Sequence, residues 1–531
     1  MTFSILFTLG VVILMLVALI TDKLRPGIIL FSAVVLLLCG RVITADEAVK
    51  GFSNKGMITV ALLYLVSEGV RNSGILQRII YRLLPRKNLS VTRSNLRFLP
   101  VVSAISAFLN NTPVVVIFAP MIKNWAKKTN LPPTKFLIPL SYATILGGIC
   151  TLIGTSTNIV VDGLISDGMS SGLFRDNPSV HNLGMFELGK AGIFICVTGL
   201  IYLILISRYL LPDRRPDSYE GETKDTPDGM TRMEVMLSTR FPGLGKTIRE
   251  FDFFRHYGVN VKAIRRRGRI VKGDYMSVKM TKDDTLLVDG DESFIKAWKD
   301  SRVFLMINRL GEIEKPMGIR KRWIALLLVV LMIVGATLGE SVGIEVLTPN
   351  VKLDMFFFAA VTTVIMAWTG MYSSRRYTKF ISWDVLITIA CAFAISQGMI
   401  NSGLADCVGK YIIALAESAR NSQNGIYIML AALYLITNIF TELITNNAAA
   451  ALAFPLALSI SNTLGVDPTP FFICICFAAS ASFSTPIGYQ TNLIVQGVGG
   501  YKFTDFVKVG LPLNIIVFLL SVFLIPLFYG V

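Results

Sequence analysis

Charged residues are scarce in this chain. Only 16% of its 531 residues are Asp, Glu, Lys or Arg, whereas soluble domains average about 25%. Histidine is rarer still, since His181 and His256 are the only two, and no Cys/His spacing typical of a metal site occurs. The seven cysteines lie in or beside apolar stretches. These shortages argue against a metal-dependent enzyme and against a disulfide framework.

Long apolar runs take the place of charge. A transmembrane helix requires about 20 apolar residues, and the chain repeatedly approaches or exceeds that length. The runs cover residues 3–20, 27–40, 57–70, 100–122, 136–166, 190–211, 322–339, 354–370, 384–400, 425–460, 470–500 and 511–529. They predict an all-α polytopic membrane protein. The first run ends at "TDKLRPG" without a small-residue cleavage site, so we interpret it as a retained helix and not a signal peptide.

The net charge of +16 is carried by loops between the apolar runs. This distribution is typical of the positive-inside rule, so it indicates membrane orientation and not a nucleic-acid partner. The lipid bilayer is the expected environment, and a cell (inner or plasma) membrane is the expected location.

A polar insert separates two apolar parts. We predict an N-terminal membrane half at residues 1–212, a linker at 213–228, a small α+β domain at 229–310 and a C-terminal membrane half at 320–531. The stretches "VNVKAI" and "DTLLVDG" alternate as strands do, and "KTIREFDFFRHY" reads as one helical piece. The segments "PGLGKTIRE", "GVNVKAIRRRGRI" and "KDDTLLVDG" resemble the C-terminal module of regulator-of-potassium-conductance (TrkA-C) domains. That resemblance implies a cytosolic regulatory role for residues within 213–319.

The stretch "GLGKT" does not form a phosphate-binding loop. That pattern needs a glycine five residues before Gly245, where Arg240 stands. We predict instead a tight turn that opens a helix, and no enzymatic activity. The basic run after it offers either a solvated hairpin tip or a site for a small anionic effector; its residues are Arg265, Arg266, Arg267 and Arg269.

The two membrane halves share an ordered set of short motifs. "VRNSGIL" parallels "MINSGLA", "NNTPVVVIFAP" parallels "NNAAAALAFP", and "GTSTNIVVDG" parallels "GYQTNLIVQG". Asn111 and Asn158 are 47 residues apart, and Asn446 and Asn492 are 46 apart. Three motifs in one order and spacing indicate an internal repeat.

Loop charge gives the repeat an orientation. The loop at residues 78–97 carries six cations and no acid, whereas the matching loop after the second "NSG" motif is neutral. The residues are Arg78, Arg82, Arg86, Lys87, Arg93 and Arg97 in the first, and Asp406, Lys410, Glu417 and Arg420 in the second. The first loop therefore belongs inside and the second outside. Equivalent loops on opposite sides predict an inverted repeat, the architecture of many secondary transporters.

Polar residues interrupt two apolar runs in each half. Residues 110–113 and 445–447 predict the tips of two re-entrant hairpins, because broken backbone at membrane depth is tolerated only against protein or a cavity. "TLIGTSTN" and "TPIGYQTN" predict two unwound helices, each facing its own tip. Amide and carbonyl oxygens suit a hard cation, and helix N-termini suit an anion. Glu442, the only acid within the second broken span, is expected to hold the hairpin by accepting hydrogen bonds or to carry a proton.

These paired motifs resemble the divalent anion:sodium symporter family over nearly the whole membrane region. The resemblance implies a dimerising scaffold, a transport domain that moves as an elevator, and Na+ as the coupling ion. It implies a first sodium site at Ser106, Asn110, Asn111 and the backbone of Gly154, and a second at Thr441, Thr445, Asn446 and the backbone of Gly488. It places the substrate at Asn111, Thr112, Thr155, Ser156, Asn446, Asn447, Tyr489 and Gln490.

The chain departs from the family pattern at the substrate positions. Its triplets are Asn-Asn-Thr and Thr-Asn-Asn instead of two Ser-Asn-Thr triplets, and Tyr489, Gln490 and Thr491 replace a Thr-Pro-Pro segment. A bulkier tyrosine favours a small tetrahedral dianion such as sulfate. The alternatives are a dicarboxylate carrier or proton coupling, a channel gated by the soluble domain, and a sensor that no longer transports. The channel lacks a filter sequence, and the sensor lacks an output motif.

Overall fold

The computed structural model describes most of the chain. The described ranges are 3–21, 24–85, 90–174, 179–213, 230–238, 240–266, 269–271, 273–282, 284–298, 301, 303–309, 318–342, 353–372, 377–415 and 425–530. Most of the predicted linker lies outside them, as do Arg86, Lys87, Arg267, Glu417 and Arg420.

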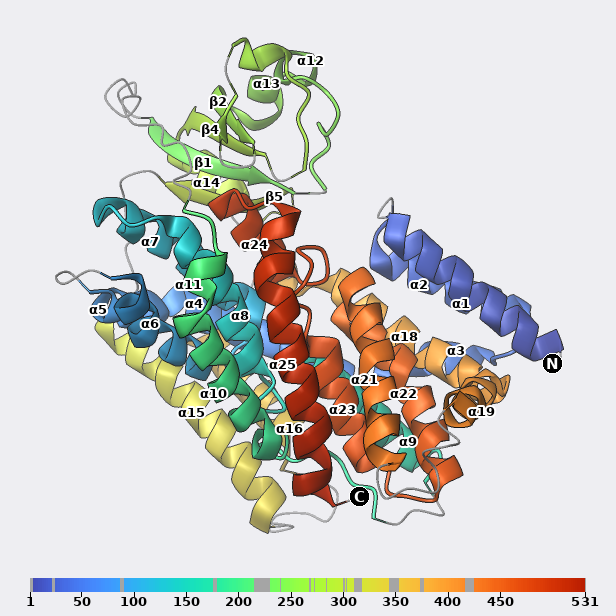
Figure 1. Ribbon diagram of the computed structural model, residues 1–531. Helices are drawn as coiled ribbons and strands as arrows, with labels where there is room; N and C mark the ends of the chain where they lie inside the picture. Colours follow the sequence, from blue (N-terminus) through green and yellow to red (C-terminus); the bar gives the residue numbers. More distant parts are fainter. Residues whose placement is uncertain are drawn as a thin grey trace.

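Among the described residues before the insert, helices account for all regular structure (Figure 1). The first group is α1 (Phe3–Thr21), α2 (Pro26–Cys39), α3 (Ala45–Lys50), α4 (Lys55–Ser73) and α5 (Ile75–Leu83). It is followed by α6 (Val91–Ser106), α7 (Asn111–Lys128), α8 (Leu137–Gly148), α9 (Ser156–Ser170), α10 (Gly189–Leu205) and α11 (Ser207–Leu210). Short 3-10 turns lie at Gly51–Ser53 and Pro133–Lys135.

A second helical series follows the insert. It comprises α15 (Ile319–Val342), α16 (Met355–Trp368), α17 (Tyr377–Phe380), α18 (Trp383–Asn401), α19 (Leu404–Leu415) and α21 (Gly425–Leu443). It ends with α22 (Asn446–Leu464), α23 (Thr469–Ser480), α24 (Gln490–Gly499) and α25 (Phe503–Tyr529).

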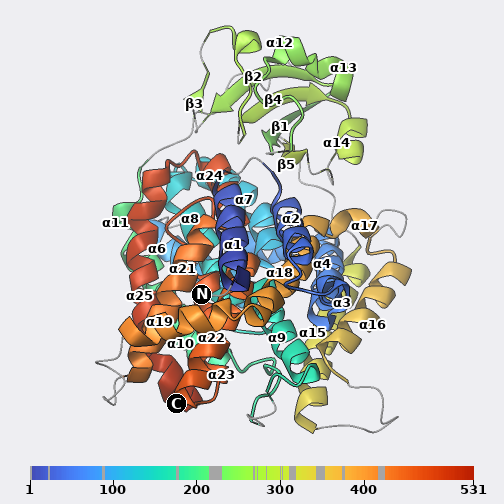
Figure 2. The same cartoon turned by 90° about the vertical axis from the view of Figure 1, so that its right-hand side faces the viewer.

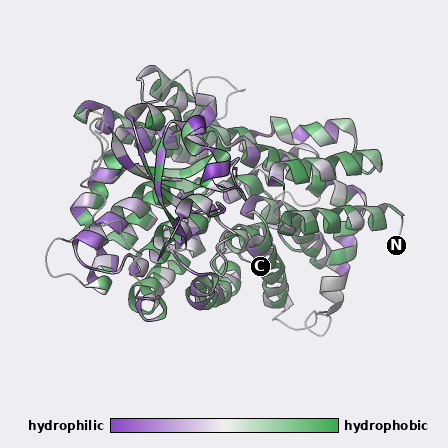
Figure 3. Cartoon of the chain, turned by 90° about the horizontal axis from the view of Figure 1, so that it is seen from above, coloured by the Kyte–Doolittle hydropathy of each residue, from purple (hydrophilic) through white to green (hydrophobic). Residues whose placement is uncertain are grey.

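The helical part is built for a lipid environment, as the apolar runs predict. Within the described ranges, six helices are long and apolar enough to span a membrane: α1, α15, α18, α21, α22 and α25. The windows of α1 and α15 are only 22% and 28% buried, so their apolar side chains face outward. Viewed from the side of the insert, hydrophobic residues, shown in green, predominate along the helices in Figure 3.

The insert folds as one antiparallel sheet with short helices. Its strands are β1 (Thr231–Leu237), β2 (Asn260–Arg266), β3 (Arg269–Ile270), β4 (Thr285–Gly290) and β5 (Phe304–Arg309), in the order β3-β2-β4-β1-β5. Its helices are α12 (Ile248–Phe251), α13 (Phe253–Tyr257) and α14 (Glu292–Trp298), and a 3-10 turn lies at Tyr275–Ser277. We call residues 230–309 the sheet unit; it lies at one end of the helical part (Figure 2).

Two local predictions for the insert are met and one is wrong. β2 and β3 pair as the expected hairpin, and Thr247 caps α12 after the turn at Gly245, which has φ +80°. The expected single helix is two, because Asp252 adopts φ 48° and ends α12. Its side chain then accepts a hydrogen bond from the Arg255 N–H and caps α13.

The arginine run that ends β2 and begins β3 is not a solvated tip throughout. Arg265 is buried against Glu234, and Arg266 makes a two-point ion pair with Asp284. These partners occupy two of the four cations proposed for an anionic effector. Arg265 and Arg266 are paired because the fold brings acids of neighbouring segments, Glu234 and Asp284, beside them. The sequence around "RRRGR" alone does not show where those acids lie.

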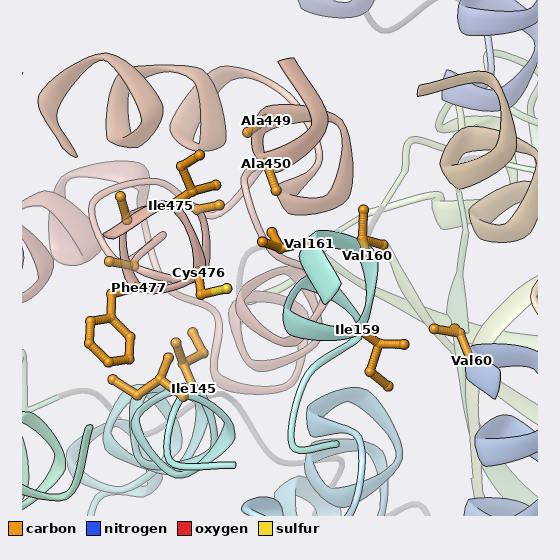
Figure 4. Packing of buried hydrophobic residues seen from close by; sticks show 14 of the residues in the cluster. Val60, Ile145, Ile159, Val160, Val161, Ala449, Ala450, Ile475, Cys476 and Phe477 are labelled. Carbon is orange, nitrogen blue, oxygen red and sulfur yellow. The ribbon is translucent and has the colours of Figure 1, made fainter. Parts of the chain in front are cut away.

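The two membrane halves share one core. Figure 4 shows Val161 of α9 near Ala450 of α22 and Cys476 of α23, and α9 contacts both of those helices. Small residues on α22 (Ala448 to Ala451) are almost fully buried, which allows this close approach. The interruptions of the helices therefore meet at the interface of the halves.

Candidate functional site

The first predicted tip lies in the turn between α6 and α7. Helix α6 ends at Ser106 and α7 begins at Asn111, and Pro113 falls within the first turn of α7, where its missing N–H costs nothing. The Ser106 hydroxyl donates to Asn111 Oδ1 at 2.6 Å. Asn110 is the N-cap residue with extended ψ, and it borders a narrow cleft with Ser67 and Ser156.

The second predicted tip repeats this geometry between α21 and α22. Helix α21 ends at Leu443 and α22 begins at Asn446, with Thr445 as its N-cap residue. The Thr441 hydroxyl lies 2.8 Å from Asn446 Oδ1 and 2.5 Å from the Ala479 carbonyl oxygen. A hydroxyl has a single proton, so these three oxygens share one donor.

The two interruptions in the late helices also match each other. Residues 149–155 separate α8 from α9, and residues 481–489 separate α23 from α24. The Gly154 N–H donates to Thr151 Oγ1 at 3.2 Å, and the Gly488 N–H donates to Thr485 Oγ1 at the same distance. The Asn158 amide donates to the carbonyls of Gly148, at the end of α8, and Thr151; the Asn492 amide donates to those of Ser482 and Thr485.

Both interruptions pack closely behind the tip of their own half. A methyl group on Gly154 would lie 2.5 Å from the Gly148 carbonyl oxygen and 3.0 Å from that of Ala107. A methyl group on Gly488 would lie 2.7 Å from the Thr441 carbonyl oxygen and would overlap the Ser482 hydroxyl. Only glycine fits at these two positions. Because glycine has no side chain, the backbone carbonyl oxygens of neighbouring segments can come close to it.

The side chains of each interruption reach the tip of the opposite half. The Asn111 amide donates to the Tyr489 hydroxyl at 2.7 Å, and Thr155 Oγ1 lies 3.3 Å from the same hydroxyl. Ser156 Oγ donates to Asn447 Oδ1 at 3.1 Å. Each interruption also faces its own tip, as expected: its backbone packs there, the Thr151 hydroxyl donates to the Ala107 carbonyl, and the Ser482 hydroxyl donates to the Thr441 carbonyl. The length of Tyr489 is what lets it cross between the halves.

Not every predicted residue joins this network. Thr112 is half-buried and Gln490 is exposed, and neither side chain hydrogen-bonds to another described residue. Thr445 Oγ1 and Asn446 Nδ2 are buried, yet they have no hydrogen-bond partner among the described residues. The Asn446 amide at the second tip thus has no acceptor among the described residues, whereas the equivalent Asn111 amide donates to the Tyr489 hydroxyl.

The site has several helix N-termini, and none of its predicted residues carries a positive charge. Helices α7, α9, α22 and α24 begin at or next to the residues that meet here, and none of the predicted site residues is charged. A helix N-terminus carries about half a positive charge and free N–H groups. Four of them around one point favour an anion.

Glu442 holds the second interruption in place, as one of its two expected roles requires. Its carboxylate accepts hydrogen bonds from the N–H groups of Ser484 and Thr485 at 2.8 and 2.9 Å, and from the amide of Asn514 at 2.8 Å. Sequence reasoning did not single out Asn514 or Ser484. The signal for Asn514 is a lone amide within the apolar helix α25.

Apolar helices, interrupted spans and an uncharged polar site between two halves define a multi-pass membrane transporter. The chain belongs to the citrate transporter family (CitMHS), whose model matches residues 16–457 and 344–531. It is therefore a transporter and not an enzyme.

Similar proteins agree with this assignment. An uncharacterized transporter of Synechocystis is 29% identical over 100% of this chain and 98% of its own length. The probable sodium/sulfate cotransporter 3 of Chlamydomonas reinhardtii is 21% identical over 92% of this chain and 84% of its own. The crystal structure of the Alcanivorax borkumensis YdaH transporter has the same fold, with a TM-score of 0.54 at 11% identity, covering 96% of this chain and 98% of that one.

Proposed function

We propose that this protein is a sodium-coupled symporter of a divalent inorganic anion, sulfate in particular. The observation that carries the proposal is the convergence of two oxygen-rich helix tips and four helix N-termini at a site without a cationic side chain. Sodium ions and helix dipoles would then supply all the positive charge that the anion meets, which makes transport depend on sodium.

The sodium assignment is supported most directly at the second tip. Thr441 Oγ1, Asn446 Oδ1 and the Ala479 carbonyl oxygen approach one another with one proton among them. A hard cation stabilises such a group of oxygens. We place the second sodium ion there with Thr445 and Gly488, and the first at the equivalent residues Ser106, Asn110, Asn111 and Gly154.

The anion assignment rests on buried hydrogen-bond donors that have no partner among the described residues. Asn446 Nδ2 and Thr445 Oγ1 are buried without partners, and an unpaired buried donor costs about 1–3 kcal/mol. A bound oxyanion would remove that cost at the amide. We place the anion between the tips with Thr112, Thr155, Ser156 and Gln490; Asn111, Asn447 and Tyr489 complete the lining.

Sulfate is favoured over larger anions because Tyr489 crosses the site and bonds to both Asn111 and Thr155. A relative carries the name sodium/sulfate cotransporter. The second candidate is citrate or another dicarboxylate, with sodium or protons as the coupling ion, and the description of the family favours it. A channel gated by the sheet unit is a more remote alternative.

Several architectural features belong to the same proposal. The matched hydrogen bonds at residues 106 and 441, 151 and 485, and 158 and 492 support an inverted repeat with re-entrant hairpins. We propose elevator motion, a homodimer in the inner or plasma membrane, and a cytoplasmic position for residues 213–319. The TrkA-C resemblance of the sheet unit suggests regulation, with an effector not yet identified.

The deciding experiment is uptake of radiolabelled sulfate into proteoliposomes, with and without an inward sodium gradient. Succinate, citrate and molybdate serve as competitors. We expect sodium-dependent sulfate uptake that molybdate inhibits. Sodium-dependent uptake of succinate or citrate without sulfate uptake would favour the second candidate.

A matched pair of variants tests the second sodium site. Thr441→Val removes the hydroxyl that meets Asn446, whereas Thr437→Val removes a buried hydroxyl whose one partner among the described residues is the Leu433 carbonyl, one turn earlier. We expect the sodium concentration for half-maximal uptake to rise about tenfold or more in the first variant, which corresponds to about 1.4 kcal/mol. Equal behaviour of the two variants would contradict the assignment.

A further inference from the structure

Strand β1 of the sheet unit has one face toward the unit and one toward the membrane helices. Met233, Val235 and Leu237 belong to the core of the unit. Met236 instead belongs to the core of the helical part, and Glu234 pairs with a residue of helix α7. This two-residue alternation is normal for a strand. It shows that β1 is packed between the two parts of the molecule.

A buried ion cluster joins β1 to α7. Glu234 Oε2 lies 3.1 Å from Lys123 Nζ, and Glu234 Oε1 lies 2.8 Å from Arg265 Nη1. The three side chains are 3%, 2% and 1% exposed, respectively, so water does not screen the cluster. Burial alone would raise the pKa of Glu234, but Lys123 and Arg265 together hold it well below its usual range.

A second contact joins the same strand to α24. The Met236 side chain occupies the space where a methyl group on Gly497 would lie, so strand β1 and helix α24 touch at that point. Helices α7 and α24 pack against each other. Figures 1 and 2 show both helices below the sheet unit.

The two helices that contact β1 are two of the four that begin at the site. Lys123 lies twelve residues after Asn111 in α7, and Gly497 lies seven residues after Gln490 in α24. A helix rises 1.5 Å per residue, so the ion cluster is about 18 Å from the tip along the single helix α7. Asn111 and Tyr489, at the starts of these helices, are hydrogen-bonded to each other.

A third tie reaches a different helix. Arg240, which follows β1, pairs with Asp384 at the start of α18 at 3.3 Å. Helix α18 packs on α2 and on α22. The sheet unit therefore contacts α7 and α24, which begin at the site, and also contacts α18.

We propose that the Lys123–Glu234–Arg265 cluster and the Met236–Gly497 contact form a junction that couples the sheet unit to the transport site. Displacement of α7 or α24 at the site moves β1, and a change in the unit shifts the first tip and the second interruption, where these two helices begin. Such coupling acts in both directions. The inference rests on the proposed function for the identity of the ligands, but not for the junction itself.

The first test compares hydrogen exchange of the full-length protein, without added ligand, in the wild type, Lys123→Met and Lys128→Met. Lys123→Met removes the tie to α7 and leaves Glu234 paired with Arg265, so the unit keeps its internal ion pair. Lys128 is an exposed cation in the last turn of α7 and serves as the control. We expect about tenfold faster exchange in residues 111–117 and 233–236 of Lys123→Met alone. Wild-type rates in both segments would overturn the junction.

The second test adds sodium and sulfate. We expect protection of residues 108–112 in the wild type and in Lys123→Met, but a change at residues 233–236 in the wild type alone. Protection of 108–112 with no change at 233–236 in the wild type would overturn the coupling. If residues 108–112 do not respond, the proposed ligands are wrong, and the ligand-free comparison alone decides the junction.

A milder variant covers the case in which Lys123→Met fails to fold. Met236→Ala keeps every charge and shortens only the side chain that meets Gly497. We expect faster exchange in residues 490–499 and 233–236, while residues 286–288 in the centre of the sheet keep wild-type rates. Unchanged exchange in 490–499 would mean that the contact transmits nothing.

Discussion

Replacement of Glu442 by Gln tests whether a fixed carboxylate shapes the second half of the site. One carboxylate oxygen accepts the Ser484 N–H and the Asn514 amide, and the other accepts the Thr485 N–H. Gln has nearly the same size, but one of its terminal groups is a donor. The variant therefore places an NH2 group against at least one existing N–H and removes the negative charge.

The expected loss follows from these three bonds. A hydrogen bond to a charged group contributes about 1.5–3 kcal/mol, and a donor left unpaired costs about 1–3 kcal/mol. Losing one bond and weakening two others gives a local cost of about 2–4 kcal/mol. Thr485 also receives the Gly488 N–H, so the cost falls on the backbone that we assign to the second sodium site.

The assay is sodium-dependent sulfate uptake in proteoliposomes at fixed sulfate and several pH values. We expect the sodium concentration for half-maximal uptake to rise at least tenfold in Glu442→Gln, since about 1.4 kcal/mol corresponds to a factor of ten. Asp406→Asn is the control, because Asp406 is an exposed acid of α19 without a described partner.

Two results would refute this reasoning. Unchanged sodium dependence would mean that the interruption does not need the carboxylate. Normal sodium dependence together with loss of the pH dependence of uptake would identify Glu442 as a proton carrier, which is the other role expected for an acid at this position.

Three further outcomes follow from the geometry. Tyr489→Phe leaves the Asn111 amide unpaired at a cost of about 1–3 kcal/mol; we expect a lower melting temperature and weaker apparent sulfate affinity, and wild-type values would exclude this bond from the working protein. Gly154→Ala places a methyl group 2.5 Å from a carbonyl oxygen and should abolish uptake, whereas Gly10→Ala, in open space, should not; equal activity would show that the close approach is not required. Because the pKa of Glu234 is lowered on folding, its ion pairs stabilise the protein above the usual pKa of 4.5 and lose that effect as the pH falls below it; exchange in residues 233–236 should accelerate below about pH 4.5, and a flat profile would contradict the buried pair.

Much of the membrane part could be predicted from the sequence, because its helices and interruptions depend on the residue types present at each place. Apolar runs predicted the helices because a lipid environment requires about 20 apolar residues for a span. Asn, Gly and Pro within those runs marked the four interruptions, since these residues weaken a helix wherever they occur. Nearly equal spacing in the two halves then predicted which interruptions correspond, and the recurring hydrogen bonds join corresponding residues.

Contacts between distant segments could not be predicted in this way. The crossing of Tyr489 to Asn111 joins residues 378 positions apart. Lys123 reads as one of several cations at the end of an apolar run, and its pairing with Glu234 depends on where the sheet unit lies. Arg265 belongs to a basic run that looks solvated until β1 places an acid beside it.

The sequence by itself determined the helical membrane class, the presence of an α+β insert and the positions of the polar interruptions, because each depends on neighbouring residues alone. Only the tertiary structure decided which tip each interruption reaches and which strand of the insert meets α7 and α24. Those choices depend on packing across the chain, where a single methyl group at Gly154 or Gly488 would be too large.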